Sequence, residues 1–229
     1  MERSATLVLT REAPDGTRVN FWVEDSENND ERVSPDIVTG LAEDFASHSI
    51  DAAYNPIRDL RFPGYIGDNG GAYNCSLTAF TMPSGACDGY SVSGSLGGFL
   101  IRQLGLDFYR NLLGNFSSTD SVAALDAAIR STQPSSDFGQ QLRAFAATSG
   151  SLMRSPSPTG FGFPARVDGS FSLPSIDPRT LLPLRTLTQS VPQRLRAYGS
   201  LPIVRSAVSG TYSEIIPVPA GTSLSVVIQ

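Results

Sequence analysis

The sequence predicts an α+β fold with an N-terminal β-hairpin, a core of about four to five helices and a β-rich C-terminal segment. Strand-forming residues are concentrated in two short runs at the start of the chain, and apolar residues recur every three or four positions in the middle. Beyond residue 170, prolines interrupt any helical pattern. We therefore expect an α+β unit over 1–148, a linker over 149–170 and a small β-rich region over 171–229.

The N-terminal hairpin is predicted from Ala5–Thr10 and Thr17–Glu24, which are rich in strand-forming residues. The turn residues Pro14-Asp15-Gly16 separate these runs, as is typical of a hairpin connection. A helix should follow, because Ser34-Pro35-Asp36 supplies a cap, a first-turn proline and an acid. Its buried stripe runs from Ile37 to Phe45.

A glycine-rich helix is predicted over Gly89–Leu104, where apolar residues repeat every four positions. Gly94 and Gly98 lie one turn apart and leave a smooth groove. Each glycine costs a helix about 1 kcal/mol relative to alanine, so close packing against a neighbouring helix should offset the cost. A flexible glycine-rich loop is the alternative.

Three more helices are predicted, and each begins with an acid near its positive end. Their apolar spacing buries one face of the second and the third. They are Asp107–Leu113, Asp120–Arg130 and Asp137–Ala147. One of the last two should cross the glycine groove.

The C-terminal part is predicted to be mostly irregular or extended. Ser149–Gly160 is rich in serine, proline and glycine, which is typical of a linker. One short helix is expected over Pro192–Tyr198, and a β-hairpin is expected from Thr211–Val218 and Ser223–Ile228. Proline at position 217 places the first of these strands at an edge or ends it early.

The charged residues exclude several classes of function. All seventeen basic residues are arginines, so Schiff-base chemistry and the phosphate loop that ends in Gly-Lys-Ser/Thr are excluded. The net charge is −5 and the arginines are scattered, so nucleic acid is not an expected partner. No run of about 18 apolar residues predicts a membrane span. The first residues do not resemble a signal peptide.

The two cysteines, Cys75 and Cys87, have two interpretations. A metal or redox pair is one of them, but the surrounding residues contain no CxxC and no histidine. A disulfide that closes a short loop is the other, and it requires Cα atoms roughly 4.4–6.8 Å apart. A disulfide would indicate an oxidising compartment. The acidic turn Asp25–Glu31 could suggest calcium, but the loop lacks the glycine at its sixth position and the glutamate at its twelfth, so it is interpreted as solvated.

Several segments resemble one family of peptidases. They are Val19–Asp25, Gly89–Gln103, Leu106–Arg110, Thr119–Ile129, Asp137–Gly139 and Ile216–Thr222. In these segments the chain is similar to bacterial hyicolysin-type secreted zinc metallopeptidases. The resemblance implies that 1–148 is the remnant of a peptidase-like domain, exported to an extracellular or periplasmic location.

The catalytic unit of that family is absent from the sequence. His-Glu-x-x-His places two imidazoles on zinc and a glutamate as general base, whereas this chain has one histidine, His48. Glu43 fits the family's later acidic ligand, but one carboxylate does not hold zinc. The departure suggests that a stretch between Phe45 and Gly89 is missing. We therefore predict no catalytic residue, no metal ligand and no bound zinc.

Three functions are compatible with this pattern. The first is an incomplete or degenerate metallopeptidase relative without activity. The second is an extracellular module that binds a protein, a peptide or a glycan. The third is an active peptidase or hydrolase that uses unrecognised residues, for which a Ser/His/Asp triad with His48 and Asp51 is one arrangement. Loss of a core helix would also expose apolar surface on the elements that packed against it.

Overall fold

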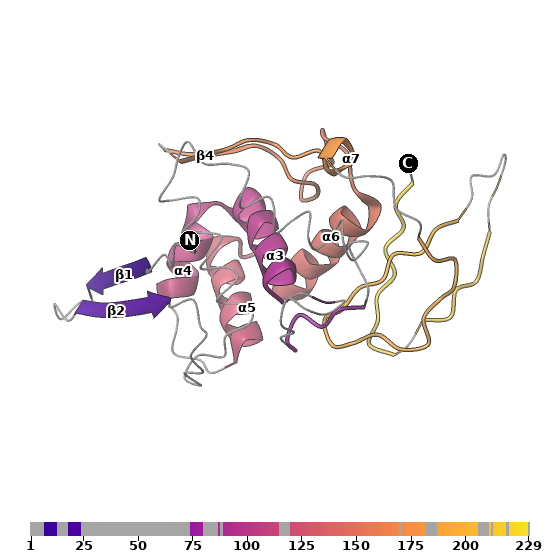
Figure 1. The fold of residues 1–229 in the computed structure, drawn as a ribbon, viewed down its shortest axis with the longest axis horizontal. Helices are drawn as coiled ribbons and strands as arrows, with labels where there is room; N and C mark the ends of the chain where they lie inside the picture. The colour runs from indigo at the N-terminus through magenta and orange to yellow at the C-terminus, as the bar shows by residue number, and fades with distance from the viewer. Residues whose placement is uncertain are drawn as a thin grey trace, which may run out of the picture.

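The computed structural model confirms the α+β class. It describes residues 7–12, 18–23, 74–79, 87, 89–114, 120–169, 171–181, 187–205, 211, 213–218 and 220–228. These residues form five helices and two small antiparallel sheets (Figure 1). The predicted helix that begins at Ser34 and the acidic turn Asp25–Glu31 lie outside the described residues.

The N-terminal hairpin consists of β1, Leu7–Glu12, and β2, Arg18–Val23. The strands are antiparallel, and their register pairs Leu7 with Val23 and Glu12 with Arg18 at the two ends. The pairing confirms the predicted hairpin. The five residues between the strands lie outside the described part of the chain.

Four helices form the core of the molecule, and α3 runs between the others (Figure 1). Their bounds are α3 Gly89–Leu104, α4 Leu106–Gly114, α5 Ser121–Thr132 and α6 Phe138–Ser151. Every residue from Val92 to Arg102 is buried, which is typical of a helix enclosed on all sides. The prediction that Gly89–Leu104 is a helix is therefore confirmed.

Aspartates begin the last two core helices, as the sequence predicts. The Asp120 carboxylate accepts hydrogen bonds from the backbone of Val122 and Ala123, and Asp137 caps α6 through the backbone N–H of Gln140. The C-terminal end of α6 differs from the prediction, because the helix continues past Ala147 to Ser151. It ends at a left-handed residue that donates back to the last turn.

The core is built around Phe99 of α3. Its ring lies 5.7 Å from the ring of Phe145 in α6 and 6.0 Å from the ring of Phe163, measured between centroids. Phe163 is one of two core residues from 149–170, together with Leu152. The segment that the sequence predicts to be a linker thus contributes two side chains to the core. Its serine, proline and glycine content indicates turns, but it does not show where the two apolar side chains pack. The division of the chain at 148 and 171 stays a prediction.

A second small sheet and a short helix follow the core. Strands β3, Arg166–Asp168, and β4, Phe171–Leu173, pair antiparallel, and α7 spans Pro178–Leu181. In Figure 1 this part of the chain runs across one side of the helical core. Leu173 and Ile176 are buried in the core.

The predicted C-terminal hairpin is wrong for the part of the chain that the structure describes. Residues 211, 213–218 and 220–228 contain no strand, and Ile215 and Ile228 are 95% and 92% exposed. Pro217 lacks the N–H group that a ladder needs, and strand propensity without a buried face does not hold two strands together. The helix expected over Pro192–Tyr198 is also absent, since that stretch binds another segment instead.

Candidate functional site

The residues that a catalytic interpretation would need are not placed by the structure. His48, Glu43 and Asp51 lie outside the described residues. Among the described residues, no three His, Cys, Asp or Glu side chains lie close enough to hold a metal ion. Within the same ranges, no helix is long and apolar enough to cross a membrane.

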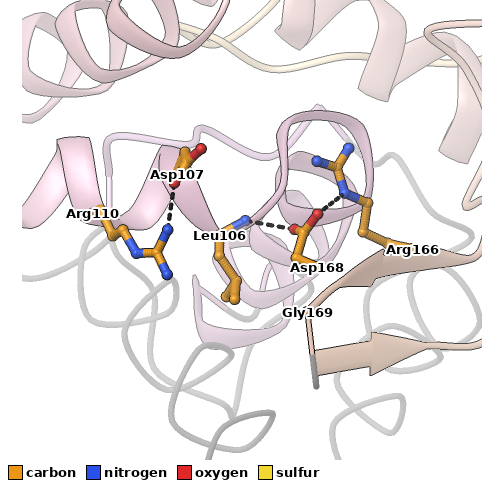
Figure 2. A pocket seen from close by; sticks show the side chains of 6 residues that line it. All are labelled: Leu106, Asp107, Arg110, Arg166, Asp168 and Gly169. Atoms are coloured by element: carbon orange, nitrogen blue, oxygen red, sulfur yellow. Dashed lines mark hydrogen bonds and ion pairs between the residues drawn. The ribbon is translucent and has the colours of Figure 1, made fainter.

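A charged hollow of about 280 Å³ lies where α3 meets α4 (Figure 2). Its walls come from the first turns of α4 and from the turn between β3 and β4. The lining residues are Leu106, Asp107, Arg110, Arg166, Asp168 and Gly169. Sequence reasoning identified none of them as functional.

Gly105 makes the sharp corner between α3 and α4. Its backbone has φ +79°, the left-handed conformation that often follows a helix C-terminus, and its N–H donates to the carbonyl of Ile101 over 2.8 Å. A Cβ at this position would overlap the Arg166 guanidinium and the Asp168 carboxylate. The left-handed backbone favours glycine here, and any larger residue would also displace the Arg166 and Asp168 side chains.

Asp168 joins the corner to the β3–β4 turn. One carboxylate oxygen accepts the backbone N–H of Leu106 over 2.9 Å, and the other accepts Arg166 Nε over 2.9 Å. Asp168 therefore satisfies an unpaired donor at the start of α4 from a strand that lies 62 residues later in the chain. Figure 2 shows the Asp168 carboxylate between Arg166 and the backbone nitrogen of Leu106, joined to both.

The second ion pair of the hollow is exposed to solvent. Arg110 and Asp107 lie one turn apart on α4, with 72% and 70% of their side chains exposed. Such pairs contribute little to stability. Both carboxylates of the hollow accept a hydrogen bond from an arginine. The arrangement acts as a clamp on the α3–α4 corner.

The predicted disulfide is present. Cys75 and Cys87 are bonded, and their Cα atoms lie 5.4 Å apart, inside the expected range. Cys75 is buried in the core cluster and Cys87 is partly buried beside it. The bond joins residues 74–79 to the chain two residues before α3 begins.

Comparison with known proteins identifies the family. The family model described as Peptidase M30 matches residues 1–46 and 41–229, which together span the whole sequence. The chain belongs to the peptidase M30 family. No curated protein and no solved structure matches it.

The peptidase M30 match agrees with the resemblance carried by Gly89–Gln103 and Ile216–Thr222. It covers all five helices and both small sheets of the described structure. A metallopeptidase relative is therefore the family-level description of the chain. In this peptidase M30 chain, the described residues assemble a clamp and a disulfide rather than a metal centre.

Proposed function

We propose that this peptidase M30 chain is a catalytically inactive metallopeptidase relative, a pseudoenzyme that keeps the scaffold without the zinc chemistry. The observation that carries the proposal is the histidine count. The whole sequence contains one histidine, His48, and no His-Glu-x-x-His. A catalytic zinc of this type needs two imidazoles on one helix to hold the metal, and the metal then polarises the attacking water.

The form of the family match supports a missing central segment. The two matched stretches, 1–46 and 41–229, overlap in the chain by a few residues. The match is thus broken near Phe45, as a missing segment at this point would require. That is the place after which the zinc helix is absent from the sequence.

Packing of the remaining helices supports a scaffold that is stable without that segment. Leu96, Phe99, Leu100 and Ile101 of α3 are fully buried. Among the described residues, every large exposed hydrophobic side chain lies outside the helices. The exposed apolar surface expected from loss of a core helix is therefore not found on α3 to α6.

We further propose an extracellular or periplasmic location. Two features support it. One is the Cys75–Cys87 disulfide, and the other is membership of the peptidase M30 family together with the resemblance to secreted metallopeptidases. Disulfides persist in oxidising compartments and are rare where glutathione keeps thiols reduced.

Metal content and turnover test the proposal together. Elemental analysis of the purified protein should find far less than one zinc per chain, and casein should not be cleaved with or without added zinc. His48→Ala is the matched control, because it removes the one imidazole of the sequence. About one zinc per chain, or cleavage that a chelator or His48→Ala abolishes, would overturn the proposal.

A second candidate function, a binding module for protein or glycan, is favoured by the C-terminal stretch. Ile215, Val226 and Ile228 are 95%, 77% and 92% exposed, which leaves three large apolar side chains accessible to a partner. Binding of fluorescent unfolded casein without cleavage would support this candidate. A triple serine variant at these positions should then bind at least about tenfold more weakly, as truncation of interface anchors does. Equal binding by both proteins counts against it.

A further inference from the structure

The loop of residues 194–202 is held against the helical core by a segment more than a hundred residues earlier in the chain. The backbone N–H of Asn74 donates to the carbonyl of Ser200 over 3.1 Å. The Ser76 hydroxyl donates to the carbonyl of Ala197 over 3.0 Å. The disulfide-bonded Cys75 lies between these two residues.

The Asn74 side chain makes the most specific contacts with this loop. Its Oδ1 accepts the backbone N–H of Arg196 over 2.6 Å, and its Nδ2 donates to the carbonyl of Arg194 over 2.9 Å. Asn74 has φ +41°, a conformation that asparagine tolerates better than most residues. One amide thus satisfies a donor and an acceptor of a loop that has no secondary structure of its own.

The loop also approaches Cys75 closely. A Cβ at Gly199 would lie 3.0 Å from the Cys75 carbonyl oxygen and 3.2 Å from Asn74 Oδ1. The loop also contacts α6, where the Tyr198 ring lies 5.5 Å from that of Phe138 and Pro202 faces Gly150. All the hydrogen bonds described between the loop and residues 74–76 therefore depend on the position of these three residues.

We propose that the Cys75–Cys87 disulfide is a redox-sensitive latch that holds residues 74–76 in place and thereby docks the 194–202 loop. Two side chains of the 74–79 segment are buried, Cys75 and Leu77, so the disulfide is one of its two anchors in the core. Breaking it removes the covalent anchor, so only the packing of the Cys75 and Leu77 side chains remains to position Asn74. The loop then loses its polar partners while its contacts with α6 remain.

Reduction of the latch by a dithiol is a balanced exchange. A thiolate of the dithiol attacks the sulfur of Cys87, the more accessible partner, and displaces the Cys75 thiolate. The second thiol of the reagent resolves the mixed disulfide and becomes part of a cyclic disulfide. Two electrons and two protons pass to Cys75 and Cys87, which end as thiols.

Amide hydrogen exchange on the full chain tests the latch directly. The Arg196 amide reports the Asn74 contact, and the Gln133 amide, which donates to Ile129 over 2.7 Å at the end of α5, serves as the control. After dithiothreitol treatment, with two free thiols verified by alkylation and mass, the Arg196 amide should exchange at least about tenfold faster, as local opening requires. The Gln133 amide should not change, and reoxidation should restore protection.

Two outcomes would overturn the latch. Unchanged exchange at Arg196 in the fully reduced protein means that packing alone holds the segment. An equal increase at Arg196 and Gln133 means that the disulfide is a staple of the whole fold. The two outcomes can be distinguished because the Arg196 and Gln133 amides lie in separate parts of the chain and their exchange rates are measured independently.

Asn74→Gly is a second test that leaves the disulfide intact. Glycine retains the left-handed backbone and the disulfide, and removes both side-chain hydrogen bonds to the loop. The variant should release Arg196 to the same extent as reduction does, with no free thiols. If Asn74→Gly leaves Arg196 protected, the asparagine does not transmit the state of the disulfide, and the proposal fails.

Discussion

The carboxylate of Asp126 on α5 accepts the backbone N–H of Phe138, the first residue of α6, over 2.8 Å. Its other oxygen accepts Arg130 Nε over 2.7 Å. These hydrogen bonds, that from Phe138 first and that from Arg130 second, lower the pKa of Asp126 below its ordinary value. Asp126 thus ties the body of one helix to the start of the next.

Asp126→Ala should destabilise the fold by about 1–2 kcal/mol, because it leaves the N–H of Phe138 without its acceptor. Asp107→Ala is the matched control, because Asp107 also pairs with an arginine one helical turn later, but its side chain is exposed. Its loss should stay within about 0.5 kcal/mol. Urea midpoints at equal slope give both values. Equal losses for the two variants would contradict the role of Asp126 between the helices.

The contribution of Asp126 should depend on pH. The pKa is lower in the folded protein than the ordinary 3.8, so the stabilisation is fully present above that value and is lost as the pH falls through the folded pKa. The difference in unfolding free energy between the wild type and Asp126→Ala should therefore be constant near neutral pH and narrow below about pH 4. If the difference in unfolding free energy widens on acidification, the pKa of Asp126 is not lowered by folding.

Gly105→Ala should cost about 2–4 kcal/mol. Alanine pays for the left-handed backbone and also displaces Arg166 and Asp168 from the corner. Gly160→Ala separates the two effects, because Gly160 has φ +83° with open space around it and should cost about 1 kcal/mol. Thermal or denaturant unfolding of both variants measures the difference. Equal losses would mean that the Arg166–Asp168 clamp moves aside freely.

Gly98→Leu should destabilise the fold by about 1–3 kcal/mol through overpacking, because Gly98 is buried in the central helix α3. Gly114→Leu is the control, because Gly114 is exposed at a helix end and a Cβ added there has no neighbour within 4 Å. Its effect on the unfolding free energy should stay within about 0.5 kcal/mol. An unchanged or raised urea midpoint for Gly98→Leu would show that the groove has room for a side chain.

Local signals made the helical core predictable. The cap residues Asp120 and Asp137 lie within three positions of the N–H groups that they accept, so sequence alone places the starts of α5 and α6. The apolar period of Gly89–Leu104 likewise belongs to one helix. The predicted C-terminal hairpin is wrong because a strand also needs a buried face, which the local pattern does not supply. The C-terminal stretch after Thr211 has strand-forming residues but no buried face to pair them on.

The sequence by itself determined which catalytic motif is absent and which two cysteines are available to pair. It contains one histidine and no His-Glu-x-x-His, and its two cysteines allow a single intramolecular disulfide, which the structure contains. Only the tertiary structure decided that Asp168 caps α4 and that Asn74 binds Arg196, 62 and 122 residues apart. Each partner is an ordinary polar residue in its own neighbourhood. The hydrogen bonds exist because folding brings an unsatisfied backbone group within reach, and no local pattern encodes that distance.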